Sequence, residues 1–287
     1  MLTGISGVLV VTLTSAVVLV LLQSGAFALS RRLGRVNVVD VTWGLGFGLV
    51  ALVAVAFSCA RGPASGSHAL VVAALVVGWG VRLAVHIGRQ SAGKGEDPRY
   101  VEMLDKHDGL DADGTPEPGP AFLRVFLLQA AAQWVVSLPL QALALAPAPA
   151  GAGLPVAVAG VVLGLFGVVY EAVADAQLGA YKRDPDRPPI MSRGLWRFSR
   201  HPNYFGDACV WWGLWVAVAA TGWGAFTVVS PLLMTYFLVW ATGARPMDQH
   251  MSGRPGWDDY ADRISFFVPL PPKRTGRFGA GAERGAE

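Results

Sequence analysis

The chain is organised around residues 194–215, which read GLWRFSRHPNYFGDACVWWGLW. A basic, aromatic and proline-broken segment passes here into an apolar run without a polar linker. Six polar side chains therefore stand where a membrane helix is expected to begin: Arg197, Arg200, His201, Asn203, Tyr204 and Asp207. Because charged groups at membrane depth are costly unless they have partners, this boundary is a candidate functional site.

The composition indicates an integral membrane protein. Of its 287 residues, 53% are hydrophobic and 15% are charged, and several apolar runs reach about 20 residues, the length that crosses a bilayer. We therefore expect an all-α, polytopic membrane protein. The net charge of +3 comes from Lys and Arg gathered in loops, which indicates topology and not nucleic-acid binding. Two cysteines and five scattered histidines have no ligand spacing, so neither a disulfide nor a metal site is expected.

The apolar runs predict seven spans and one domain. The expected spans are roughly 5–29, 38–60, 68–87, 121–145, 156–181, 204–220 and 223–242. A long polar loop, 88–120, follows the third span, and the last two spans form a tight hairpin. The single membrane domain covers 1–273, and the Gly/Ala/Arg-rich tail 274–287 is expected to be disordered. No internal repeat is visible, which argues against an inverted-repeat transporter.

The basic residues predict the orientation. With the N-terminus outside, the cytoplasmic loops and their helix ends hold 22 of the 23 Lys and Arg residues, and only Arg61 falls outside. This asymmetry predicts an N-out, C-in protein of the cytoplasmic (inner) membrane, with an active site that faces the cytoplasm.

Two of the predicted spans carry charged groups near their cytoplasmic ends: Arg82, His86 and Arg89 on the third, and Tyr170, Glu171 and Asp175 on the fifth, ahead of Lys182. The spacing i, i+4, i+7 places the first set on one helix face. Snorkelling to the interface or helix-end ion pairs would also account for each set alone. Opposite charges at matching depth instead favour a shared polar pocket.

Two glycine-containing stretches invite comparison with nucleotide-binding loops. In GKGEDPRY, residues 93–100, Lys94 and Arg99 could bind phosphate groups, although an ordinary solvated loop has the same composition. In GLGFG, residues 44–48, the glycines lie inside an apolar helix. Close helix packing by Gly44 and Gly48 explains that stretch better.

Asp40 lies just inside the second predicted span, one turn before Trp43. One interpretation is a helix start at which Asn37 and Asp40 cap the helix or favour the positive end of its dipole, with Trp43 as an interface anchor. The other is a buried acid that protonates or polarises a substrate carbonyl. The residues alone leave both open.

Several motifs taken together carry a family resemblance. They are SRHPNYFGD with WWG (199–207 and 211–213), the pair Glu171 and Asp175, the loop GKGEDPRY, and the closing WDDYADRISFFVPLPPK (257–273). Together they resemble the bacterial membrane branch of the steroid 5-alpha-reductase family, from about Asp40 to Lys273. Methyltransferases of the isoprenylcysteine carboxyl type carry a similar RHPxYxG motif and bind S-adenosylmethionine. They typically place a Glu-Glu pair after the last span, where this chain has only Asp248.

The resemblance implies that NADPH binds among cytosolic helix ends and loops. It assigns to cofactor binding Arg82, His86, Asp175, Lys182, Asn203, Asp207, Tyr260 and Arg263. The polar clusters described above add Arg89, Lys94, Arg99, Glu171, Arg197, Arg200 and His201.

The catalytic residues implied by the resemblance match less closely. Steroid reductases use a Glu in the second helix and a Tyr in the third, where this chain offers Asp40 and Trp79. We therefore expect Asp40, Tyr100 or Tyr204 to supply the proton.

The predicted activity is reduction of a carbon-carbon double bond in a steroid, isoprenoid or fatty acyl substrate that enters from the bilayer, with hydride from NADPH. The alternative is an S-adenosylmethionine-dependent lipid or prenyl methyltransferase. A transporter or membrane scaffold without catalysis is a third class.

Overall fold

The computed structural model describes residues 4–273, and these residues form helices and connecting segments without a β-strand. Among them, six helices are long and apolar enough to cross a membrane: Gly4–Leu33, Asn37–Cys59, Pro63–Ser91, Pro118–Val136, Gly153–Arg183 and Trp223–Met251. The predicted all-α class is confirmed, and the helices are those expected of a multi-pass membrane protein.

The predicted span 204–220 is a helix, α9 (Pro202–Ala219), but it is not one of these six. Its first two turns contain Asn203 and Asp207, which lower the hydropathy of an 18-residue helix. The predicted number of seven spans and the N-out orientation stay predictions.

The chain divides into two compact units. The first comprises the residues up to Leu165 together with Trp211–Leu233, and the second comprises Phe166–Val210 together with the residues from Met234 onward. Helices α8 (Gly153–Arg183), α9 and α10 (Val229–Tyr236) each contain a boundary between the units. This division by contacts does not test the predicted single domain, and the predicted disordered tail lies outside the described residues.

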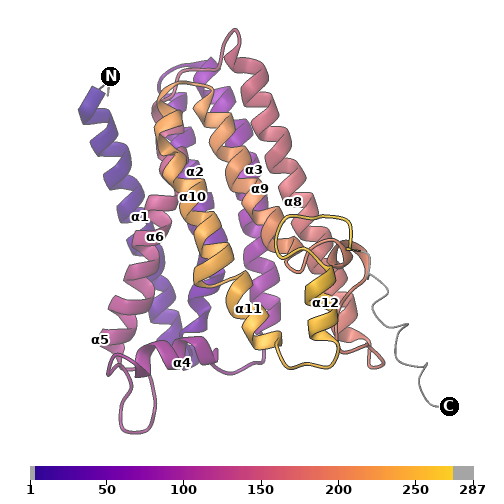
Figure 1. The fold of residues 1–287 in the computed structure, drawn as a ribbon. Coiled ribbons are helices and arrows are strands. Elements are labelled where there is room, and N and C mark those ends of the chain that lie inside the picture. Colours follow the sequence, from indigo (N-terminus) through magenta and orange to yellow (C-terminus); the bar gives the residue numbers. More distant parts are fainter. Residues whose placement is uncertain (1–3, 274–287) are drawn as a thin grey trace, which may run out of the picture. The chain divides into compact units, whose positions relative to one another are not determined.

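The first unit contains the long helices α1 (Gly4–Leu33), α2 (Thr42–Cys59) and α3 (Pro63–Ser91), followed by α6 (Leu128–Val136) and α7 (Leu138–Leu145) (Figure 1). Helix α2 packs against α1, α3 and α7. Its closest approach to α3 is made by two glycines, because a Cβ added to Gly44 would lie 2.2 Å from the Gly80 carbonyl oxygen. The predicted packing role of Gly44 is confirmed, and Gly48 faces Val77.

Short elements decorate one end of α2. The 3-10 helix η1 (Asn37–Val41) precedes α2. Helix α4 (Pro98–Asp105) lies within the region predicted as a polar loop, and α5 (Pro118–Ala121) begins at the C-terminal end of that region. A π-helical segment, η2 (Phe122–Leu127), leads into α6. One buried cluster holds these pieces together: Ala26, Val36, Val38, Val39, Leu104, Ala121, Val125 and Phe126.

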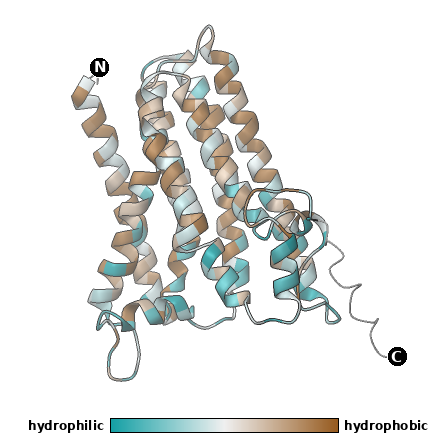
Figure 2. Cartoon of the chain, in the orientation of Figure 1, coloured by the Kyte–Doolittle hydropathy of each residue, from teal (hydrophilic) through white to brown (hydrophobic). Residues whose placement is uncertain are grey.

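The second unit contains η3 (Gly194–Arg197), the π-helical η5 (Phe237–Ala241), α11 (Ala244–Met251) and α12 (Trp257–Arg263), besides its parts of α8, α9 and α10. In Figure 2, α4, α11 and α12 carry many hydrophilic residues, whereas α1 is mainly apolar. The segment after α12 returns to the start of the RHPNY motif. Arg200 N donates to the Ser265 carbonyl at 2.9 Å, and Leu270 N donates to that of Phe198 at 2.9 Å.

The remaining helical piece of the first unit is η4 (Trp223–Val228), which packs against α7. The adjoining cavity, of about 660 Å³, is lined by Arg61, Leu145, Pro147, Thr221, Gly222, Trp223 and Phe226. One of its lining residues, Arg61, comes just after the C-terminal end of α2, whereas Asp40 comes just before the N-terminal end of the same helix. None of the predicted site residues lines it.

Candidate functional site

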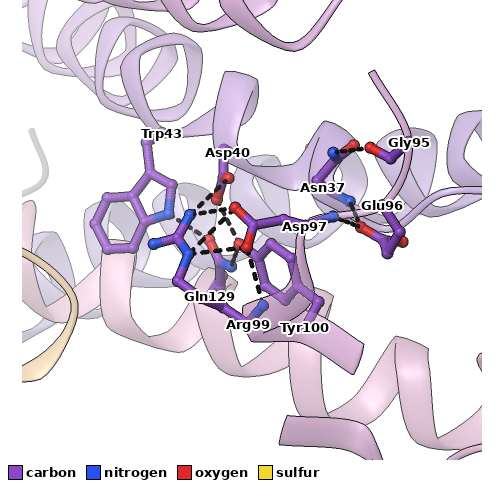
Figure 3. A network of polar contacts seen from close by, with 9 residues as sticks. All are labelled: Asn37, Asp40, Trp43, Gly95, Glu96, Asp97, Arg99, Tyr100 and Gln129. Atoms are coloured by element: carbon purple, nitrogen blue, oxygen red, sulfur yellow. Dashed lines mark hydrogen bonds and ion pairs between the residues drawn. The ribbon is translucent and has the colours of Figure 1, made fainter. Parts of the chain in front are cut away.

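Asp40 and Tyr100, two of the predicted proton sources, form a direct hydrogen bond in the first unit. The Tyr100 hydroxyl, on the first turn of α4, donates to Asp40 Oδ1 at the end of η1. Gln129 of α6 donates its Nε2 to the Tyr100 oxygen at 3.1 Å, and Trp43 Nε1 donates to Gln129 Oε1. Figure 3 shows these side chains pointing toward one another from three separate segments. Two residues that were predicted as alternative proton sources therefore belong to one hydrogen-bond network, which Gln129 and Trp43 complete.

The loop before α4 is fastened to the start of η1, which brings Tyr100 over Asp40. The Glu96 carboxylate accepts from the main-chain nitrogens of Val36 and Asn37, the latter at 3.0 Å. Arg35 donates to the Lys94 carbonyl at 3.0 Å. The orphan N–H groups at a helix start are thus satisfied by a side chain from 60 residues further on.

Neither η1 nor α2 has a side-chain hydrogen bond at its N-cap, so the predicted capping by Asn37 and Asp40 is wrong, while a favourable interaction of Asp40 with the helix dipole stays a prediction. Glu96 accepts from the N–H groups at the start of η1, and α2 has no side-chain cap at its N-terminus. The hydrogen bond that Asp40 Oδ1 accepts comes from Tyr100.

Arg99, whose guanidinium group lies near the Asp40 carboxyl group, forms an ion pair with another acid, Asp97. The Arg99 guanidinium lies 2.7 Å from Asp97 Oδ2 and 3.7 Å from Asp40 Oδ2. The hydrogen bond from Arg99 lowers the pKa of Asp97, so Asp97 stays ionised. Burial, together with the neighbouring Asp40, raises the pKa of Tyr100 well above its usual value. Tyr100 is therefore a protonated donor at neutral pH.

In the loop that was predicted to bind phosphate, residues 93–100, two acidic side chains of the loop itself take the places expected for a bound anion. Glu96 occupies the start of η1, where an anion would bind, and Asp97 pairs with Arg99. Lys94 is exposed. A role of Lys94 and Arg99 in cofactor binding stays a prediction.

The predicted residues of the third span lie on α3 in the first unit. Arg82 and His86 are half-buried and Arg89 is exposed, in the order expected for a helix that leaves an apolar region. His86 Nε2 lies 2.5 Å from Gln90 Nε2. Their predicted role in cofactor binding is not decided by these contacts.

In the second unit, the RHPNY motif is tied to α11. Asp248 accepts at both oxygens, with His201 Nε2 at 2.7 Å and an Arg200 guanidinium nitrogen at 3.2 Å. The His201 ring is stacked on Tyr204, with centroids 5.7 Å apart, and Phe266 meets it edge-on. A carboxylate on a neighbouring helix thus orients the two basic residues of the motif. Tyr204 remains a predicted proton source.

Buried polar groups gather on α8 and α9 of the same unit. Glu171, Asp175 and Asp207 are each at most 7% exposed. Asn203 Nδ2 donates to Asp175 Oδ1 at 3.4 Å, while Asn203 Oδ1 is buried and makes no hydrogen bond within residues 4–273. Glycines allow this closeness, since a Cβ on Gly206 would lie 2.7 Å from Glu171 N. An open buried acceptor fits a ligand that carries N–H or O–H donors.

The other predicted cofactor residues of this unit are one buried tyrosine and three exposed cations. The buried Tyr260 hydroxyl donates to the Trp196 carbonyl at 2.7 Å, and burial raises the Tyr260 pKa above its usual value. Its hydroxyl thus holds η3 in place. The exposed cations are Lys182, Arg197 and Arg263.

The residues described above, from Asp40 to Arg263, lie within a match to a known protein family. A family model described as "Protein of unknown function (DUF1295)" matches residues 26–264. The chain belongs to this family. DUF1295 is associated with steroid 5-alpha-reductase-like proteins. The comparison with curated proteins and the comparison with solved structures each return no match.

Sequence reasoning missed one polar residue in each unit of this DUF1295 chain. Gln129 lies in an apolar run with no motif around it, and only its distance to Tyr100 reveals it. The contacts of Asp248 with Arg200 and His201 follow from no motif around it. Its position on a polar helix directly after the last apolar run was the available signal.

Proposed function

We propose that this protein is a membrane-embedded, NADPH-dependent reductase of a carbon-carbon double bond conjugated to a carbonyl group in a lipid-like substrate. The observation that carries the proposal is the hydrogen bond between Tyr100 and Asp40. The chain has Trp79 where the resemblance calls for a catalytic tyrosine, and Trp79 is a core residue, 1% exposed, packed against Phe47 and Trp211. Tyr100 supplies a phenol from α4 instead.

A carboxyl and phenol pair suits the charge that develops during such a reduction. Hydride addition to the alkene places negative charge on the carbonyl oxygen of the substrate. Asp40 can offer that oxygen a proton while its carboxyl group accepts the hydrogen bond from Tyr100, and general acid catalysis of this kind contributes about 10²–10⁴-fold. A bound nicotinamide would supply the hydride.

The residues of the second unit fit a dinucleotide. Arg200 and the exposed cations Lys182, Arg197 and Arg263 offer charge to phosphate groups. Asn203 Oδ1 offers a buried acceptor. These are features of the donor set, and they support NADPH as the proposed cofactor.

The proposed topology follows from the basic residues. We propose that the N-terminus lies outside and that the loops after spans one, three, five and seven face the cytoplasm, in the cytoplasmic membrane. Substituted-cysteine labelling at Arg61 and Lys182 from the two sides of the membrane tests this orientation.

The decisive experiment measures NADPH, NADH and S-adenosylmethionine binding to protein purified in detergent, followed by NADPH oxidation with steroid, isoprenoid and fatty acyl enones. We expect saturable NADPH binding and enone-dependent NADPH oxidation. Saturable S-adenosylmethionine binding without NADPH binding would overturn the proposal in favour of a methyltransferase. Absence of binding for every cofactor, with function unaltered in Asn203→Ala and Asp207→Ala, would favour a transporter or scaffold.

A further inference from the structure

The hydrogen-bond chain that ends on Asp40 has a fixed direction. The Trp43 indole nitrogen can only donate, so the side-chain amide of Gln129 must turn its oxygen toward Trp43. Its nitrogen then faces the Tyr100 oxygen at 3.1 Å. Since this nitrogen is also a donor, the Tyr100 proton cannot point toward Gln129. Among the described contacts of Tyr100, the Asp40 oxygen is the acceptor that remains.

Gln129 is held where it meets Tyr100 by its neighbours on α6. Gln133, one turn later on the same face, donates to the carbonyl oxygens of Thr42 and Trp43 at 3.0 and 3.1 Å. Gln23 of α1 in turn donates to Gln133 Oε1 at 2.9 Å. These bonds fix the junction between η1 and α2, and therefore the position of Trp43 itself.

The π-helical η2 supports this arrangement independently. It ends at Leu127, two residues before Gln129. A wider turn of this kind shifts the following residues by about one position, or roughly 100° around the helix axis, compared with a continuous α-helix. The face that carries Gln129 and Gln133 is thereby turned toward the η1 junction. Such segments occur frequently at functional sites.

We propose that Gln129 and Trp43 are positioning residues that hold Tyr100 as the hydrogen-bond donor to Asp40, which makes Asp40 the group that delivers the proton. This inference rests on the proposed function. Asp40, which accepts from Tyr100 at Oδ1, would carry its proton on Oδ2 and give it to the substrate carbonyl oxygen. A bound nicotinamide would supply the hydride to the alkene carbon, which makes that oxygen electron-rich. The resulting enol rearranges to the ketone. The carboxylate that remains on Asp40 is stabilised by the hydroxyl of Tyr100, and solvent returns the proton.

The test uses the unliganded protein and reads Tyr100 directly. With 3-fluorotyrosine placed at position 100, the fluorine NMR signal reports ionisation of this phenol as pH is raised. The charged groups that face the pair are Arg99, Asp97 and Glu96, and they are unchanged in the variants. Gln129→Met removes the donor to the Tyr100 oxygen, and Trp43→Phe frees the Gln129 amide to rotate.

We expect the pKa of residue 100 to rise by about 1 in Gln129→Met, because a phenolate without the amide donor is less stable. A smaller rise is expected in Trp43→Phe. Gln249→Met, which changes an exposed glutamine on α11, should leave the signal as it is. A pKa of residue 100 that is the same in Gln129→Met and Trp43→Phe as in the parent would overturn the inference. If Gln129→Met does not fold, Trp43→Phe still tests it.

Activity gives a second, separate readout. We expect kcat for enone reduction to fall about tenfold in Gln129→Met with KM for NADPH unchanged, since the Tyr100 hydroxyl, without the Gln129 donor, gives a weaker hydrogen bond to the carboxylate that forms on Asp40. A normal kcat would count against the positioning role. If the protein reduces no enone, the proposed function fails while the fluorine titration still stands on its own.

Discussion

The two polar regions of this protein are built in opposite ways. The Asp40 region is assembled from side chains of η1, α4 and α6, and its charges are balanced locally, with Arg99 paired to Asp97. The RHPNY region is one continuous stretch whose basic residues are oriented by Asp248. A balanced acid pair is suited to holding and moving a proton, whereas a region with exposed cations around it is suited to binding an anionic cofactor. The difference teaches that the two tasks can be tested separately.

The largest expected effect separates chemistry from cofactor binding in the first region. Asp40→Asn keeps the shape of the side chain but removes the proton donor. We expect kcat for enone reduction to fall at least about 100-fold, while the Kd for NADPH changes less than about twofold. Calorimetry and NADPH oxidation measure the two quantities. Asp105→Asn, the same change at an exposed position of α4, should leave kcat and the Kd for NADPH as they are. A large loss of NADPH affinity in Asp40→Asn would contradict the separation of chemistry from cofactor binding.

The second region should show the reverse pattern. In Asp248→Asn an amide nitrogen replaces one of the two carboxylate oxygens that accept from Arg200 and His201. The motif loses a charge-assisted hydrogen bond, and we expect the Kd for NADPH to rise about tenfold with kcat at saturating NADPH nearly unchanged. Asp258→Asn on the exposed face of α12 is the matched control. A fall in kcat with unaltered affinity would assign Asp248 to chemistry instead.

The smallest expected effect concerns the hydrogen bond by which Tyr260 stabilises the second unit. Tyr260→Phe removes the hydroxyl that donates to the Trp196 carbonyl, at a cost of about 1 kcal/mol in the free energy of unfolding near pH 7. Because the folded pKa of Tyr260 is raised, its contribution is fully present below the unfolded value of about 10. It is lost as pH rises through the folded value.

The stability difference between parent and Tyr260→Phe should therefore narrow above about pH 10. Unfolding in detergent at several pH values measures it. A difference that stays constant, or widens, in this range would contradict the assigned role of the hydroxyl.

Local patterns carried most of the helix assignment. Runs of about 20 apolar residues predicted the long helices to within a few residues, as at Pro63–Ser91 against the expected 68–87. They failed where the region was polar. Helix α4 was hidden in the predicted loop because it is only eight residues long, and packing of Leu104 in a buried cluster stabilises it.

The sequence by itself determined the membrane-spanning helical class, the glycine contact at Gly44 and the polar motif before α9, because each depends on residues that are neighbours along the chain or share a helix face. Only the tertiary structure decided that Tyr100 is the partner of Asp40, 60 residues away, and that Gln129 lies behind it. The reason is physical. The Tyr100 contact depends on Glu96 fastening a loop to the start of η1, and the Gln129 contact depends on a π-helical turn that resets the face of α6. Neither can be read from the spacing of residues, because both arise from packing between distant segments.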